Sequence, residues 1–232
     1  MGLLGLRLLS GVRTYMNISA CIFDMDGLLI DSESIALSVF QQTCDYYGIG
    51  HQKPLYQQLL GTNHDTTRTI LNKELPARIN VQEFTEYWSE HYSALTSQGV
   101  PLMKGVDNLL TYLETMKIPK AVATSTQTER AIGKLEHSGI AHRFSFIIGG
   151  DQIVHGKPAP DIYLKAADAL SIEPSHCLGL EDSPNGVKAA MSAGLNVIQI
   201  PDTLQPNEAL LSLGHTVLDD LDAVVSLLQS HQ

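Results

Sequence analysis

The chain has 232 residues and a formal net charge of -10, with 25 acidic and 15 basic side chains. This length is enough for one domain with a substantial insertion, or for two small domains. The acidic balance excludes wholesale binding to nucleic acid or to anionic membranes, because both require clustered Lys and Arg.

The first fifteen residues carry five leucines and two arginines. Their apolar run is too short to cross a bilayer, so we predict no association with a membrane. We expect residues 1–15 to be a leader, or an over-extended reading frame in which Met16 is the true start.

Three cysteines occur in the chain: Cys21, Cys44 and Cys177. Their number is odd, they lack metal-ligand spacing, and two of them lie in apolar, strand-like runs. We therefore predict buried free thiols in a reducing compartment, and we expect a cytoplasmic monomer.

The first predicted strand, residues 18–23, is an apolar run that ends on Asp24 and Asp26. An extended backbone returns to the same side every two residues, so both carboxylates can converge, and Gly27 lets the chain turn away. Two acids this close repel each other unless a divalent cation, a shared proton or a bound cationic group intervenes, and Mg²⁺ suits oxygen ligands best. The alternative is an ordinary strand followed by a solvated, acidic helix start.

Helical spacing follows from Ser32 to the glycine at residue 48, and again over residues 66–74 and 81–95. So many successive helices cannot serve as crossovers between parallel strands. We therefore predict an inserted helical domain over residues 32–101, with hinges where it enters and leaves.

From residue 105 onward, helices and short apolar runs alternate, which is typical of a doubly wound sheet. We predict an α/β fold with a mostly parallel sheet, formed by residues 16–31 and 102–232. The later predicted strands are residues 121–123, 144–148, 177–180, 197–200 and 216–218. The predicted helices between them are residues 106–116, 129–138, 161–170, 185–193 and 221–228.

Polar side chains follow two of these later strands. Thr124 and Ser125 come directly after residues 121–123, and Glu181 and Asp182 follow residues 177–180. Taken alone, the hydroxyls are as well explained by a helix cap, which we expect Thr126 to provide, and the acids by a helix start.

Lys157 stands immediately before Pro158, which restricts the lysine to an extended backbone and so directs its side chain. A lone lysine before a helix is usually solvated. We expect the neighbouring His155 to be a loop residue and not a metal ligand.

Taken together, these segments resemble the four motifs of the haloacid dehalogenase superfamily, in their order along the chain. The matching segments are Asp24-Met25-Asp26-Gly27-Leu28-Leu29-Ile30-Asp31, Thr124, Gly156-Lys157-Pro158-Ala159-Pro160-Asp161 and Glu181-Asp182. The closest resemblance is to phosphatases and β-phosphoglucomutase-like enzymes, which implies a Rossmann-like core with a helical cap between the first two motifs.

The resemblance also implies a role for each matching residue. Asp24 is the expected nucleophile and forms an aspartyl phosphate, while Asp26 is the general acid and base. Lys157 neutralises the nucleophile and the phosphate oxygens. The implied phosphate-binding residues are Gly27, Thr124, Ser125 and Lys157, and the implied Mg²⁺ ligands are Asp24, Asp26 and Asp182, with Glu181 as an additional or outer-shell acid.

The cap is expected to select the substrate. His64 stands where β-phosphoglucomutases carry a phosphate-gripping arginine, and Arg68, one helical turn away, could substitute for it. A solvated helix start is the alternative for His64. We expect Trp88, with Tyr87 and Tyr92, to belong to the core of the cap.

These observations predict a Mg²⁺-dependent phosphatase that acts on a small phosphomonoester, such as a sugar phosphate or a related metabolite. Asp26 distinguishes the chain from dehalogenases and phosphonate hydrolases of similar fold, which lack an acid at this position. Two alternatives remain: a hexose-phosphate mutase resembling β-phosphoglucomutase, and a phosphate-binding protein without turnover.

Overall fold

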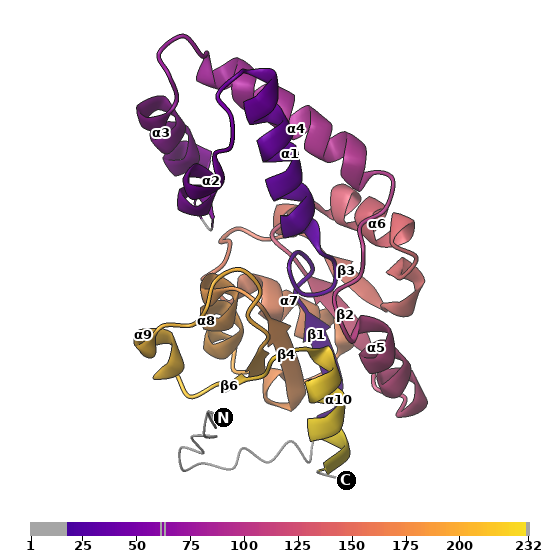
Figure 1. The fold of residues 1–232 in the computed structure, drawn as a ribbon. Coiled ribbons are helices and arrows are strands. Elements are labelled where there is room, and N and C mark those ends of the chain that lie inside the picture. The colour runs from indigo at the N-terminus through magenta and orange to yellow at the C-terminus, as the bar shows by residue number, and fades with distance from the viewer. Residues whose placement is uncertain (1–17, 61, 63, 231–232) are drawn as a thin grey trace, which may run out of the picture.

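A six-stranded parallel sheet forms the centre of the molecule (Figure 1). The computed structural model describes residues 18–60, 62 and 64–230. The strands are β1 (Ala20–Phe23), β2 (Lys120–Ala123), β3 (Phe146–Ile148), β4 (Cys177–Glu181), β5 (Asn196–Gln199) and β6 (Thr216–Val217), in the order β3-β2-β1-β4-β5-β6. All five strand pairs are parallel, which confirms the predicted α/β class.

Helices cover both faces of this sheet. Helices α5 (Val106–Thr115), α6 (Thr128–His137) and α10 (Leu221–Ser230) share one apolar cluster with the sheet. Helices α7 (Asp161–Leu170) and α8 (Pro184–Ser192) share another, and the short helix α9 (Glu208–Leu211) adds Leu210 to it. Because both faces are covered, the strands are continuous apolar runs without alternation.

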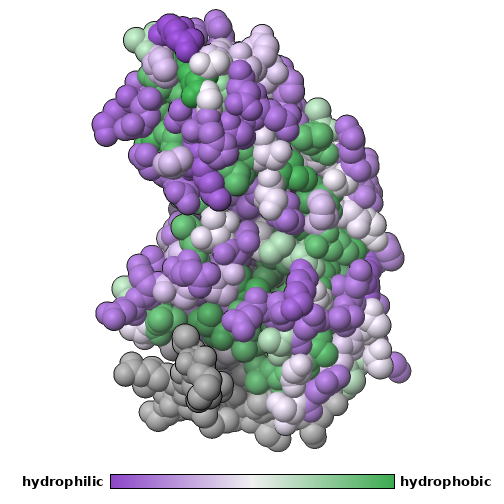
Figure 2. All heavy atoms as spheres, in the orientation of Figure 1, coloured by the Kyte–Doolittle hydropathy of each residue, from purple (hydrophilic) through white to green (hydrophobic). Residues whose placement is uncertain are grey.

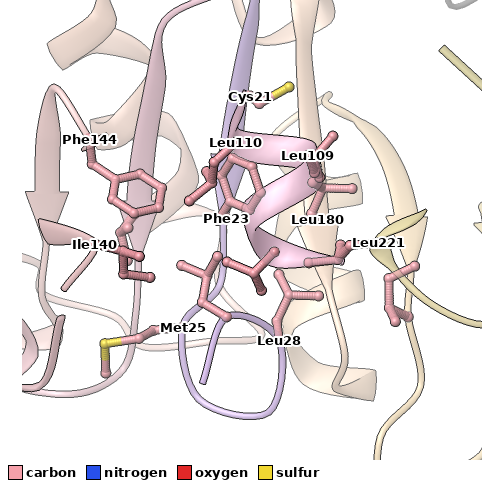
Figure 3. Close-up of a cluster of buried hydrophobic side chains, with 14 of the residues drawn as sticks. Cys21, Phe23, Met25, Leu28, Leu109, Leu110, Ile140, Phe144, Leu180 and Leu221 are labelled. Carbon is pink, nitrogen blue, oxygen red and sulfur yellow. The ribbon is translucent and has the colours of Figure 1, made fainter. Parts of the chain in front are cut away.

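Alternate residues of β1 enter the two clusters. Cys21 and Phe23 pack with α5 and α10, as Figure 3 shows, whereas Ala20 and Ile22 pack on the opposite face. All four side chains are fully buried. The packing of both faces therefore holds the end of β1 in place, and with it the residues that follow.

Four helices lie between β1 and the remaining elements of the core: α1 (Ser32–Tyr46), α2 (Lys53–Leu59), α3 (His64–Glu74) and α4 (Val81–Thr96). They enclose an apolar cluster of their own. They stand above one edge of the sheet, and the surface is hollowed between them and the core (Figures 1 and 2). We call these four helices the cap; its boundaries at residues 32 and 101 stay a prediction.

The two chain segments that join the cap to the core run side by side. The backbone N–H of Asp31 donates to Pro101 O at 2.8 Å, and Ile30 pairs with Leu102 in an isolated bridge. The Asp31 side chain also caps α1 by accepting from Ser34 N at 3.1 Å. This paired crossing is consistent with the hinges expected at both ends of the insertion.

The predicted elements of the core all overlap observed ones, with differences at their ends. The strand predicted from residue 144 begins at Phe146, because Phe144 still caps a 3₁₀ turn. Sequence analysis did not delimit α2 and α9.

The prediction for residues 1–15 lies outside the described residues, and no helix in the described part of the chain is long and apolar enough to span a bilayer. Cys21, Cys44 and Cys177 are buried free thiols, as predicted.

We predict that Phe40→Ala destabilises the cap by about 3–5 kcal/mol, because it leaves a cavity among aromatic neighbours. Phe40 is fully buried, and its ring centroid lies 5.0 Å from that of Trp88. Trp88 is the only tryptophan of the chain, so its fluorescence during urea unfolding reports on the cap. The matched control is Tyr46→Ala on the same helix, where the side chain is 67% exposed. Equal shifts of the urea midpoint in both variants would contradict this packing.

Candidate active site

The carboxyl ends of three adjacent strands meet at one point of the sheet. Strand β1 lies between β2 and β4, and Phe23 is in register with both Val122 and Leu180. The chain fills one side of the sheet through β2 and β3 and then crosses to β4, so this point is the topological switch where ligands of such sheets bind.

A cavity of about 210 Å³ lies at this switch. Most of the predicted site residues line it, together with groups from the cap and from the loop after β5. The lining residues are Asp24, Asp26, Thr124, Ser125, Lys157, Asp182, Ser183, Glu33, Leu60, Thr203 and Leu204. The structure therefore brings together residues that lie up to 180 positions apart in the chain.

Lys157 is held between two buried carboxylates. Its Nζ donates to Asp24 Oδ1 at 2.5 Å and to Glu181 Oε1 at 2.6 Å, and its side chain is only 6% exposed. Burial alone would lower the pKa of the ammonium, but Asp24 and Glu181 outweigh this effect and raise the pKa above its ordinary value. The ammonium stays charged and ties the loop after β3 to the ends of β1 and β4.

Asp24 has an environment that makes its charge costly. Burial raises the pKa of this carboxyl to about 7, Lys157 opposes the rise, and the negative charge of Glu181 adds to it. One ammonium therefore does not compensate the carboxylates gathered here. A bound cation, or a proton on one of the carboxyl groups, would offset this excess of negative charge.

Glu181 is surrounded by protein donors. Its Oε1 accepts from Lys157 and from Tyr163 Oη, and its Oε2 accepts from the backbone N–H groups of Asp182 and Ser183 and from Ser183 Oγ. These contacts anchor Lys157, and the expected role of Glu181 as an additional or outer-shell acid stays a prediction. A Cβ on Gly186 would overlap this carboxylate, which explains the glycine in the first turn of α8.

Asp182 faces the loop that follows β1. Burial raises the pKa of its carboxyl well above the ordinary value, and the charges of Glu181 and Asp24 raise it further. A Cβ on Gly27 would lie 2.8 Å from Asp182 Oδ2, so the glycine makes room for this carboxylate. Gly27 also has φ of +82°, a conformation that favours glycine.

The donors at this point suit a hard cation. Asp24 is buried and Asp182 is half-buried, and burial, with the charge of the neighbouring carboxylates, raises the pKa of both groups. Oxygen is the ligand that Mg²⁺ prefers. Among the described residues, no group of three or more His, Cys, Asp or Glu side chains is arranged to hold an ion. Backbone carbonyls or water must therefore complete the coordination of any ion bound here.

Asp26 has partners that sequence analysis missed. Thr126 Oγ1 donates to Asp26 Oδ2 at 2.7 Å, and Lys134 Nζ donates to Asp26 Oδ1 at 2.7 Å. The expectation that Thr126 caps the next helix is wrong: α6 begins at Thr128, whose backbone N–H donates to Asp151. Lys134 lies three residues after the buried Ala131, beside the apolar stripe of α6, and that position was the available sign of an inward lysine.

The two predicted hydroxyls differ in their surroundings. Thr124 is buried, and its Oγ1 accepts from Thr126 N at 3.1 Å, so its hydroxyl proton can be donated to another acceptor. Ser125 is exposed and lines the cavity. Both lie where an oxygen of a bound phosphoryl group could accept a hydrogen bond.

The cap contributes residues other than those expected. Glu33 and Leu60 line the cavity, and Glu33 Oε2 accepts from Tyr56 Oη at 2.9 Å. Burial raises the pKa of Glu33, although the bond from Tyr56 opposes this. Arg68 is exposed and is not among the described residues that line the cavity. The side chain of His64 lies outside what the structure describes, so its predicted role stays a prediction.

The aromatic residues of α4 have separate locations. Trp88 packs on Phe40 in the core of the cap, as expected. Tyr87 stacks on Tyr46 with ring centroids 4.4 Å apart. Tyr92 departs from the expectation, because its hydroxyl accepts from Lys134 Nζ of the core at 3.2 Å.

Comparisons with known proteins show the family. A family model described as haloacid dehalogenase-like hydrolase matches residues 21–200. The phosphorylated carbohydrates phosphatase of Thermotoga maritima is 29% identical over 90% of this chain and 98% of its own length. The fructose-1-phosphate phosphatase YqaB of Escherichia coli is 25% identical over 80% of this chain and 98% of its own length.

Solved structures share the architecture. CbbY from Rhodobacter sphaeroides in complex with phosphate superposes with a TM-score of 0.69 and 28% identity, covering 88% of this chain and 95% of that one. β-Phosphoglucomutase from Clostridium difficile has a TM-score of 0.69 at 23% identity, over 92% of this chain and 96% of its own, and shows the shared fold alone.

We predict that, in the presence of EDTA, Asp24 makes the chain less stable as the pH rises from about 4 to 7. Its pKa is raised from 3.8 to about 7, so the folded chain binds more protons than the unfolded chain within this window. Protonation of Asp24 therefore stabilises the folded chain relative to its charged form. This contribution to the free energy of unfolding is complete below about pH 4, is lost by about pH 7, and amounts to at most about 4 kcal/mol.

Urea unfolding of the native chain and of Asp24→Asn at several pH values checks this prediction. The difference in free energy of unfolding between the two proteins should shift against the native chain as the pH rises. Parallel stability curves would show that the carboxyl of Asp24 titrates alike in the folded and unfolded chains.

Proposed function

This chain belongs to the haloacid dehalogenase-like hydrolase family, and on that premise we propose that it is a Mg²⁺-dependent phosphatase acting through an aspartyl phosphate on Asp24. The chain is a phosphoric monoester hydrolase, since its relatives in this family are named phosphatases. The observation that carries the proposal is the buried pairing of Lys157 with Asp24 at the switch point. A nucleophilic carboxylate beside a fixed ammonium is suited to attack on a phosphoryl group.

In the first step, an Asp24 oxygen forms a bond to phosphorus as the bond from phosphorus to the leaving oxygen breaks. Asp26, in its protonated form, gives the leaving oxygen a proton, so that an alcohol departs. In the second step, water attacks phosphorus and Asp26 takes back a proton, which releases inorganic phosphate and restores Asp24. One difficult displacement is thereby divided into two easier ones.

Charge on the phosphoryl oxygens must be stabilised in both steps. We assign this role to the ammonium of Lys157, the hydroxyls of Thr124 and Ser125 and the backbone after Asp24. Support comes from the cavity, which Lys157, Thr124 and Ser125 line together with Asp24. Glu181 contributes indirectly, because it holds Lys157 in place. The low exposure of the lysine strengthens its interaction with a bound anion.

Hydrolases of this family generally use Mg²⁺, and the residues here fit that ion. Asp24, Asp182 and the backbone carbonyl of Asp26 would hold it, with water completing the coordination. When bound, Mg²⁺ supplies positive charge that offsets the buried carboxylates and the phosphate dianion.

We predict that Mg²⁺ raises the thermal midpoint of unfolding without any substrate present. Binding to the folded chain alone at 100 times the dissociation constant stabilises it by about 2.7 kcal/mol. Asp182→Asn should remove most of this shift, because it deletes a charged oxygen ligand, whereas the matched control Asp168→Asn, at an exposed position of α7, should keep it. A shift of equal size in all three proteins would contradict the assigned ligands.

The proposed substrate is a small phosphomonoester, such as a sugar phosphate or a related metabolite. A cavity of about 210 Å³ that Glu33 and Leu60 of the cap also line suits a compact leaving group. The named activities of the relatives, on phosphorylated carbohydrates and fructose 1-phosphate, point to the same class. We place the enzyme in the cytoplasm, since its buried free thiols suit a reducing compartment. We also propose that it is a monomer.

The test is phosphate release from a panel of sugar phosphates, nucleotides and other small phosphomonoesters. We predict release by the native chain and a loss of at least about 10³-fold in Asp24→Asn, because the amide is not a nucleophile while the volume is unchanged. Circular dichroism confirms the fold of the variant. Activity close to native in Asp24→Asn would contradict the aspartyl phosphate.

Two other outcomes of this panel would replace the proposal. Conversion of β-glucose 1-phosphate into glucose 6-phosphate, with a trace of the bisphosphate present, would indicate a mutase. The absence of phosphate release from every compound would indicate a phosphate-binding protein without turnover.

A further inference from the structure

Lys134 of α6 contacts the proposed general acid from outside the four motifs. Its Nζ lies 2.7 Å from Asp26 Oδ1, and its side chain is only 12% exposed. Thr126 Oγ1 occupies the other oxygen at 2.7 Å. Together the two hydrogen bonds fix the side-chain torsions of Asp26 and so the orientation of its carboxylate.

This arrangement bears directly on proton transfer. A general acid must present one oxygen to the leaving group within hydrogen-bond reach, and later present it to water. Each carboxyl oxygen has two lone pairs, so Asp26 can accept from Thr126 and Lys134 and still carry a proton toward the leaving group. The two contacts therefore set the direction in which that proton is presented.

Lys134 is also linked to the cap. The same Nζ donates to Tyr92 Oη of α4 at 3.2 Å and lies 5.3 Å from the centroid of the Tyr92 ring. One ammonium therefore joins the loop after β1, the core helix α6 and helix α4 of the cap.

A second cavity, of about 580 Å³, lies beside this ammonium between α4 and α6. Lys134 and Tyr92 line it, as does Arg130, one turn earlier on α6. A small ion from solvent can thus reach the position of the lysine head group if the side chain is shortened.

We propose that Lys134 is a positioning residue for Asp26, which fixes the carboxylate for proton transfer and, through Tyr92, makes that orientation depend on the cap. The inference rests on the proposed function, because it assigns a role within the same reaction. It concerns proton delivery to the leaving oxygen and not attack by Asp24.

The experiment compares two matched aryl phosphates. Phenyl phosphate needs a proton on its leaving oxygen, whereas p-nitrophenyl phosphate releases a nitrophenolate without one. For each protein, kcat/KM is measured for both compounds, because this constant reports steps up to formation of the phosphoenzyme. In Lys134→Ala we expect kcat/KM to fall about 10-fold more for phenyl phosphate than for p-nitrophenyl phosphate.

Rescue separates positioning from loss of structure. Ethylammonium, which carries N–H donors, should restore most of the lost activity of Lys134→Ala on phenyl phosphate by entering the second cavity. Tetramethylammonium at the same concentration should not, because it has no donor. Lys134→Arg should retain the native ratio of the two constants, and Tyr92→Phe should show a smaller shift than Lys134→Ala.

Arg130→Ala is the matched control, because it truncates a cation on the same helix and beside the same cavity without touching Asp26. It should leave both constants near native. Equal losses on the two phosphates in Lys134→Ala, or equal rescue by the two cations, would overturn the positioning role while leaving the phosphatase in place. No release by the native chain from these compounds or from any member of the phosphomonoester panel would overturn the proposed function and this inference with it.

Discussion

The ammonium of Lys157, enclosed by Asp24 and Glu181, is the interaction on which the rest of the site depends. It brings a loop after β3 to the ends of β1 and β4, and it is almost fully removed from solvent. A buried charge left without any partner costs several kcal/mol. In Asp24→Asn the ammonium keeps Glu181 as its partner, whereas loss of both carboxylates would leave it unpaired. Three acidic groups, Asp24, Glu181 and Asp182, face this single buried lysine.

The order of the strands explains why these groups meet. Because β1 lies between β2 and β4, the residues that follow three separate strands reach the same edge of the sheet. The first strand is packed on both faces, so its end is a rigid platform for Asp24. The cap contributes Glu33 and Leu60 to the lining of the cavity. The groups proposed for the chemistry follow the strands of the sheet, and the cap lines the opposite side of the cavity.

Much of this site could be predicted from the sequence, because Asp24, Thr124, Lys157 and Asp182 all follow predicted strands or precede helices at recognisable positions. The partners of Asp26 could not. Lys134 reaches it only because of how α6 rotates and packs, and a lysine near an apolar stripe is usually solvated at its tip. The role of Glu181 was hidden for a related reason, since its five donors come from three separate segments and are apparent only in the folded chain.

The central claim is that Asp24 becomes transiently phosphorylated. Acid quenching during turnover, followed by borohydride reduction, converts an aspartyl phosphate into homoserine, which mass spectrometry of the peptide around residue 24 detects. The account predicts homoserine at this position only when a hydrolysed substrate is present. Phosphate release with an unmodified Asp24, or reduction at another aspartate, would contradict it.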